Sequence, residues 1–169
     1  MFRKSLLLPL FALLFCAVAA RAETVRLPAT GTPAYSFNVP DGWIIVYDQY
    51  GNLRISAADK SSALLLSMIE DPAVDTTPAA EVAAEIIKSS GAPPYTRTGS
   101  GRIAGLAADA FYTQLVNDKG VTLDFKLEIV KLDPTHYASQ ATLSVTDMTP
   151  AQTGALDALI EDVRFTGPK

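Results

Sequence analysis

The chain has 169 residues, of which 49% are hydrophobic and 19% are charged. Its first 22 residues contain three of the 14 basic residues and none of the 18 acidic ones, so the remainder has 11 basic and 18 acidic residues and a net charge of −7. This balance argues against nucleic acids and anionic membrane surfaces as partners, because both attract basic patches.

The N-terminus has the three parts of a secretory signal peptide. Two basic residues precede an apolar run over residues 6–20, and Ala20 and Ala22 form an A-x-A recognition site for signal peptidase. An uncleaved anchor is one alternative, but the run is shorter than the roughly 20 apolar residues of a spanning helix. A lipoprotein is another, although the bulky Phe15 before Cys16 does not suit that processing. We expect cleavage after Ala22, a periplasmic or secreted protein, and no stable membrane anchor.

The remaining 147 residues are enough for one domain with a hydrophobic core. Cys16 is the only cysteine, so the mature chain can form no disulfide. Residues 23–34 contain Pro28, Gly31 and Pro33 and are predicted to be an irregular leader. The single domain is then expected over residues 35–166.

Four strands are predicted before the first helix. Apolar and polar residues alternate over 35–39, and a Pro-Asp-Gly turn follows. Residues 43–47 and 53–57 form the next two strands around a turn. Residues 63–69 are apolar on both faces, which indicates a central, buried strand.

The first helix is predicted to begin with Thr77 as its N-cap and Pro78 as its first helical residue. After the helix, strands are expected over 95–100 and 108–116, with a glycine-flanked bend over 102–105 between them.

The next segment, 121–129, has the clearest alternation in the chain. Its odd positions are apolar and its even positions are polar, which predicts a strand with one dry and one solvated face. Residues 137–145 pair back on it, and the capping box of Thr149 and Gln152 begins a final helix. Because tight turns join antiparallel strands, the pattern predicts an α+β domain with an antiparallel sheet of about six to eight strands and two main helices.

These elements and their motifs resemble the PsbP-like (Mog-type) superfamily. The motifs are YSFNVPDGW over residues 35–43, RIAGLAADAF over 102–111, a long hairpin, and a last helix that ends in VRF. The resemblance covers about residues 32–166 and implies an α/β/α-type sandwich. It also implies proteins that are mostly non-catalytic and bind other proteins, and no partner-binding residue is transferred from it.

His136 is the only histidine, with Asp133 and Ser139 nearby in the sequence. A catalytic triad is one interpretation, but such triads are assembled from distant segments, so we favour a turn or strand-end residue. Glu70 and Asp71, with a third acid at Asp75, could bind calcium weakly, although carboxylates before a helix usually interact with its dipole.

Two further patterns could indicate chemistry. The glycines of residues 99–105 resemble a phosphate loop, but a strand pattern follows them, so a glycine-rich bend is favoured. Asp124 and Glu128 could form a carboxylate pair, but they lie on the solvated side of the same strand with Lys126 between them. We therefore assign no catalytic residue, metal or cofactor.

Aromatic residues gather around one strand and its turn. Trp43, Tyr47 and Tyr50 are the candidate partner-contact residues. Among them Trp43 is favoured as a core residue, and Tyr47 and Tyr50 are the better candidates for a contact surface. The first hypothesis is a non-enzymatic periplasmic accessory protein that contacts another exported or envelope protein. The alternatives are an immunity protein that neutralises a secreted toxin and a hydrolase with an unrecognised site.

Overall fold

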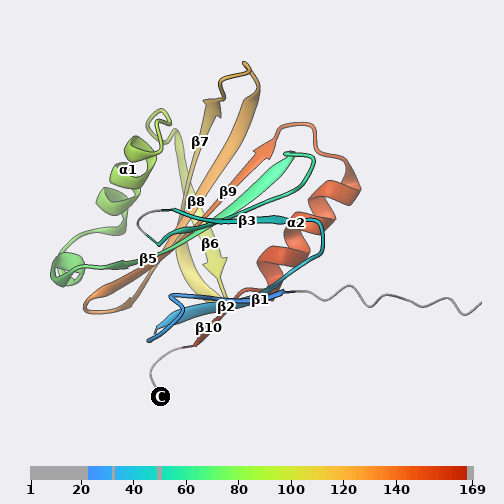
Figure 1. Cartoon of the computed structure of the whole chain (residues 1–169). Helices are drawn as coiled ribbons and strands as arrows, with labels where there is room; N and C mark the ends of the chain where they lie inside the picture. Colours follow the sequence, from blue (N-terminus) through green and yellow to red (C-terminus); the bar gives the residue numbers. More distant parts are fainter. Residues whose placement is uncertain (1–22, 32, 49–50, 167–169) are drawn as a thin grey trace, which may run out of the picture.

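The computed structural model describes residues 23–31, 33–48 and 51–166 (Figure 1). The elements in chain order are β1 (Glu23–Leu27), β2 (Ala34–Val39), β3 (Ile44–Tyr47), β4 (Leu53–Ser56), β5 (Ser62–Glu70), the short 3-10 helix η1 (Pro72–Asp75), α1 (Ala79–Ser89), β6 (Arg97–Ile103), β7 (Leu106–Val116), β8 (Thr122–Asp133), β9 (His136–Val145), α2 (Pro150–Asp162) and β10 (Arg164–Thr166).

A seven-stranded sheet forms the centre of the domain. Its strand order is β3-β4-β5-β9-β8-β7-β6, and all neighbouring strands are antiparallel. The helix α1 lies on one face of this sheet, and α2 lies on the other (Figure 1). The predicted α+β class, antiparallel sheet and two-helix layering are therefore confirmed. A second sheet of order β1-β2-β10 covers part of the α2 face.

The alternation of β8 explains how α1 is held. Phe125, Leu127 and Ile129 are buried on the face that packs against α1, as predicted from their spacing. Ala83 and Ile87 are the buried residues of α1 and meet them there. We call this side of the seven-stranded sheet the α1 face.

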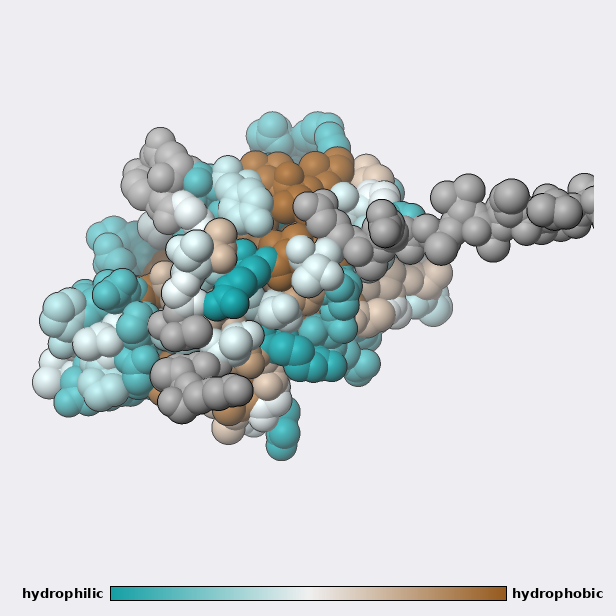
Figure 2. Space-filling view, turned by 60° about the horizontal axis from the view of Figure 1, so that its bottom comes forward, coloured by the Kyte–Doolittle hydropathy of each residue, from teal (hydrophilic) through white to brown (hydrophobic). Residues whose placement is uncertain are grey.

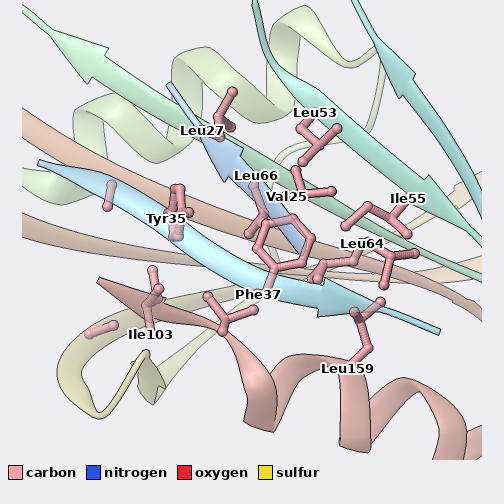
Figure 3. Close-up of a cluster of buried hydrophobic side chains, with 14 residues drawn as sticks. Val25, Leu27, Tyr35, Phe37, Leu53, Ile55, Leu64, Leu66, Ile103 and Leu159 are labelled. Atoms are coloured by element: carbon pink, nitrogen blue, oxygen red, sulfur yellow. The ribbon is translucent and has the colours of Figure 1, made fainter. Parts of the chain in front are cut away.

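The main core fills the space between the two sheets (Figure 3). Tyr35 and Phe37 point from β2 toward Leu64 and Leu66 of β5, and Leu159 of α2 closes one side. The Tyr35 hydroxyl donates a 2.8 Å hydrogen bond to the carbonyl oxygen of Ser139. This bond joins the small sheet directly to the centre of the large one.

The segment expected to be an irregular leader is partly a strand. Residues 23–27 form β1 and pair with β2, with Val25 opposite Phe37 and Leu27 opposite Tyr35. Val25 and Leu27 are both 5% exposed, so their alternate spacing buries them in the core. Pro28 and Gly31 come after the strand and end it rather than interrupt it.

The two helices begin close to where the sequence predicts. In α2, Thr149 is the N-cap and forms the predicted capping box with Gln152. In α1, the N-cap is Pro78, one residue later than the predicted Thr77, and its side chain makes no capping hydrogen bond. A proline side chain has no oxygen to accept the hydrogen bond that Thr149 accepts at the start of α2.

The glycine-rich segment 99–105, predicted as a bend between strands, is mostly the edge strand β6, which overlaps the predicted strand over 95–100 and continues to Ile103. It pairs in register with β7 from Arg97 opposite Tyr112 to Ile103 opposite Leu106. The turn follows only at Ala104 and Gly105, both of which have positive φ angles.

Candidate functional site

Strand β3 is an edge of the seven-stranded sheet, and no other strand of the described part of the chain pairs with its outer side. Ile44, Val46 and Tyr47 are 49%, 40% and 54% exposed, and they are half of the large exposed hydrophobic residues found in the described part of the chain. Figure 2 shows a brown, apolar patch at the top of the view, where the rotation places β3. We call these three residues the β3 patch.

The turn after β3 is held by side-chain bonds. The backbone N–H of Asp48 donates to the Asn52 carbonyl oxygen over 3.0 Å, and the Asp48 carboxylate accepts from the Asn52 backbone N–H and side-chain amide at 2.9 and 2.8 Å. Along two antiparallel strands, opposite residues alternate between pairs that are hydrogen-bonded through their backbones and pairs whose backbone groups point away from each other. Since Asp48 and Asn52 are a bonded pair, the backbone groups of Ile45 and Tyr47 point away from β4.

The two edges of the seven-stranded sheet differ in charge. At the β6 edge, Arg97 and Arg102 are charged, and such residues discourage pairing with another strand. The β3 strand has the sequence IIVY and no charge. An uncharged apolar edge is the kind of surface that pairs with an added strand.

A groove lies beside β3 on the α1 face. It has a volume of about 590 Å³, and its lining includes Val46, Arg54, Leu65, Ile69, Ile86 and Leu127. It is open because α1 packs mainly against β8 and leaves Leu65 and Ile69 of β5 only half-buried. Arg54 forms no ion pair with the residues that the structure describes.

A second hollow, of about 720 Å³, lies over β6 to β9 and is lined by polar residues together with Pro93, Tyr112 and Phe125. The Arg97 guanidinium stacks 3.9 Å from the centre of the Tyr112 ring. Gln114 donates a 2.8 Å hydrogen bond to Asp124, and Lys126 also lines the hollow. The polar side chains here are thus largely engaged with one another.

The prediction that Glu128 is solvated is wrong. Glu128 is 3% exposed and its carboxylate accepts hydrogen bonds from Lys126 (2.7 Å), Gln140 (3.1 Å) and the backbone N–H of Arg102 (3.2 Å). It is hidden because Gly101 of β6 has no side chain, and a Cβ there would lie 2.1 Å from Oε1. Asp124 and Glu128 therefore serve different contacts and do not form a carboxylate pair.

Tyr35 lies close enough to the Glu128 carboxylate for the two groups to interact electrostatically. Burial raises the pKa of Tyr35 well above its ordinary value, and the negative charge of Glu128 raises it further. The phenol therefore stays neutral and keeps its hydrogen bond to Ser139. Its role is to join the sheets.

Trp43 packs against the main core, as favoured from the sequence. It also lines a third hollow of about 400 Å³ beside α2. There Asp59 accepts from Gln152 over 2.8 Å and from the backbone N–H of Ser61 over 3.0 Å. These bonds lower the pKa of Asp59 to about 2, chiefly through Gln152.

His136 is the first residue of β9 and follows the tight turn between β8 and β9. Its Nδ1 is 2.9 Å from the Asp133 carboxylate and 3.0 Å from the Thr135 hydroxyl. None of the three hollows described above includes it. Ser139 is three residues further along the strand and so points to the opposite face. The structure therefore does not bring His136, Asp133 and Ser139 together as a triad.

This turn predicts an acid-sensitive contribution to stability. The backbone N–H of Thr135 first, and His136 second, lower the pKa of Asp133 from 3.8 to about 2. A lowered folded-state pKa stabilises the protein above the unfolded pKa, and this stabilisation disappears as the pH falls from about 4 to 2. We expect the free energy of unfolding of Asp133→Asn, measured in urea, to be lower than that of the wild type at pH 6 and to approach it near pH 2. A difference in free energy that is the same at both pH values would contradict this.

The acidic residues before α1 do not converge. Among the described residues, no group of three His, Cys, Asp or Glu side chains is placed to hold a metal ion. Asp75 instead pairs with Lys131 at 2.6 Å, and the backbone N–H of Asp71 donates to the Thr135 carbonyl oxygen. The possible calcium site at Glu70, Asp71 and Asp75 gains no support from this geometry.

Several predicted residues lie outside the described part of the chain. These are Ala20 and Ala22 of the expected signal-peptidase site, together with Cys16 and Tyr50. Within the described residues, neither helix has the length and apolar character needed to cross a membrane. The signal peptide stays a prediction.

Sequence comparison alone does not place the chain, because no family model and no curated protein matches it. Solved structures do match. Cyanobacterial PsbP (CyanoP) from Synechocystis sp. PCC 6803 superposes with a TM-score of 0.59 and 14% identity, over 89% of this chain and 96% of that chain.

Two other structures agree with this match. LpqN from Mycobacterium tuberculosis has a TM-score of 0.50 and 13% identity, covering 86% of this chain and 91% of its own. The Ran-binding protein Mog1p from Saccharomyces cerevisiae has a TM-score of 0.51 and 11% identity, covering 86% and 97%. At such low identity the likeness concerns the fold alone. The chain therefore has the PsbP-like fold, also found in Mog1p, that its sequence motifs indicated.

Proposed function

We propose that this chain is an exported, non-enzymatic accessory protein that acts by contacting another protein of the cell envelope. The observation that carries the proposal is the β3 patch, an uncharged and exposed edge strand beside an apolar groove. Exposed apolar surface with a polar rim is typical of protein-binding sites. The signal-peptide pattern of the N-terminus supports the location.

The structures with the same fold are compatible with this role. Mog1p is a Ran-binding protein, and LpqN is involved in cell envelope biogenesis. Those functions belong to those proteins, but they show that this fold serves in binding and in the envelope. The non-enzymatic part of the proposal is supported by the place of His136, which lies at the start of β9 and outside the lining of the groove.

The proposal predicts that one charge on the β3 patch abolishes partner binding. Tagged mature protein, residues 23–169, would be cross-linked in the periplasm of its own organism and its partners quantified by mass spectrometry. We expect Val46→Asp to lower the recovery of specific partners about tenfold or more, because a carboxylate here would interrupt the apolar surface and pair with Arg54, which lies directly opposite on β4.

Val116→Asp is the matched control, since Val116 is also an exposed valine near a strand end, 65% exposed, but lies at the far end of β7. It should bind as the wild type does. Both variants should keep the wild-type circular dichroism and melting temperature. Equal recovery with Val46→Asp, or no partner with the wild type, would contradict the proposed function.

A further inference from the structure

We propose, on the basis of the proposed function, that the partner adds an extended segment to the β3 edge. The segment has apolar side chains at alternate positions and a carboxylate that pairs with Arg54. The occupant is thus a strand-forming, acidic-apolar stretch of another protein.

The outer edge of β3 presents backbone groups that could pair with a further strand. Ile45 and Tyr47 direct their N–H and C=O groups away from β4, by the alternation set at Asp48. Among the described residues, no other strand pairs with this edge. An added strand would satisfy these groups and extend the sheet by one member, which is how extended peptides bind at open sheet edges.

The side chains of β3 favour apolar residues in the added strand. Ile44 and Val46 lie on the α1 face, and Tyr47 lies on the opposite face of the strand. Residues of the added strand that alternate to the α1 face would lie beside Val46. From there they could enter the groove, whose lining includes the half-buried Leu65, Ile69 and Ile86 and whose volume of about 590 Å³ accommodates one or two large side chains.

The charge of the groove favours an acidic residue in the partner. Arg54 is the residue directly opposite Val46 on β4, so its side chain lies on the same face one strand further in. It lines the groove and is free of ion pairs among the described residues. Asp48, the other charged residue of the lining, is bonded to Asn52. An unpaired guanidinium beside an apolar floor is complementary to a carboxylate.

The test uses a phage library of random twelve-residue peptides selected on the mature domain. We expect enriched peptides to alternate apolar residues and to include Asp or Glu. In amide hydrogen exchange, a synthetic copy of the enriched peptide should protect Ile45 and Tyr47 and leave the β6 edge unchanged. A library without enrichment, or protection confined to β6, would overturn the proposal.

A pair of variants at Tyr47 separates backbone pairing from side-chain contact. Tyr47→Pro removes both the ring and the outward N–H, whereas Tyr47→Ala removes only the ring. Proline is tolerated where an edge N–H faces solvent, so both variants should fold, as circular dichroism would show. We expect Tyr47→Pro to lose measurable peptide binding and Tyr47→Ala to weaken it by only about threefold. Equal binding by the two variants would exclude strand addition.

A second pair tests the charge. Arg54→Glu should lower the affinity for the acidic peptide by about tenfold or more. Arg97→Glu, on the opposite edge of the sheet, should leave that affinity unchanged. If Arg54→Glu binds like the wild type, the carboxylate is not recognised there. If Val46→Asp loses its envelope partner while Tyr47→Pro and Tyr47→Ala retain it equally, the proposed function holds and strand addition fails.

A second copy of this chain is the other occupant that the experiment must exclude. Sedimentation of the mature domain should give a monomer over the concentrations used for peptide binding. A dimer that Tyr47→Pro abolishes would assign the edge to self-association and would overturn the proposal.

Discussion

Replacing Gly101 with alanine is expected to lower the free energy of unfolding by about 3 kcal/mol. The new Cβ would lie 2.1 Å from Oε1, 2.9 Å from Cδ and 3.0 Å from Cγ of Glu128. The carboxylate cannot simply move aside, because Lys126, Gln140 and the N–H of Arg102 hold it. Shifting it would leave buried donors without an acceptor.

Gly99→Ala is the matched control, since a Cβ at this second glycine of β6 would meet only the Tyr112 ring, at 3.4 Å. We expect it to change stability by less than about 0.5 kcal/mol, measured by urea unfolding. The double variant Gly101→Ala, Glu128→Ala should be more stable than the sum of its single changes predicts. If Gly101→Ala is as mild as Gly99→Ala, the close packing described here is wrong.

Phe37→Ala should be still more destabilising, by about 4 kcal/mol. Phe37 is 2% exposed and points from β2 into the core between the two sheets (Figure 3). No neighbouring strand can collapse into the space left by the ring without breaking the pairing of β2 with β1 and β10. The loss would be a large part of the 5–15 kcal/mol that stabilises a typical domain.

Phe37→Leu should cost only about 1 to 1.5 kcal/mol, because it keeps most of the buried volume. Thermal and urea unfolding of both variants would measure the difference. A cost of less than about 2 kcal/mol for Phe37→Ala would mean that the small sheet contributes little to the core.

Periodic elements were predictable because one face of each is buried. The alternation over residues 121–129 identified β8 and its buried side chains Phe125, Leu127 and Ile129. The capping box at Thr149 and Gln152 identified the start of α2. In both cases the signal is local, since it depends on residues that are close together in the sequence.

The small sheet was harder to predict because its signal is distant. β1 has only five residues, and its strand character depends on pairing Val25 with Phe37. β10 has three residues and pairs with β2 across nearly the whole chain. Short segments of this kind become strands through tertiary contacts rather than through their own composition.

The burial of Glu128 had a sequence signal whose meaning became clear only in the structure. Glycines at alternate positions of a strand indicate that another group approaches its backbone closely. Gly99 and Gly101 follow that rule, with Tyr112 and Glu128 as the approaching side chains. The sequence could not show this, because it requires the register of β6, β7 and β8.

The candidate site was predicted in part. Tyr47 was named as a contact residue from its place near a turn, and it is exposed on an edge strand; its contact role stays a prediction. Arg54, Leu65 and Leu127 were missed because their gathering in a groove depends on where α1 packs on the sheet. That position is set by helix packing and has no local pattern.

The arrangement of the small sheet has a consequence for the order of folding. Strand β2 lies between β1, which precedes it, and β10, which ends at Thr166 (Figure 1). A chain emerging from the ribosome cannot complete this sheet until residues 164–166 have been made. One edge of β2 therefore stays unpaired while the intervening strands and helices are synthesised, so the small sheet closes only after the large sheet is available.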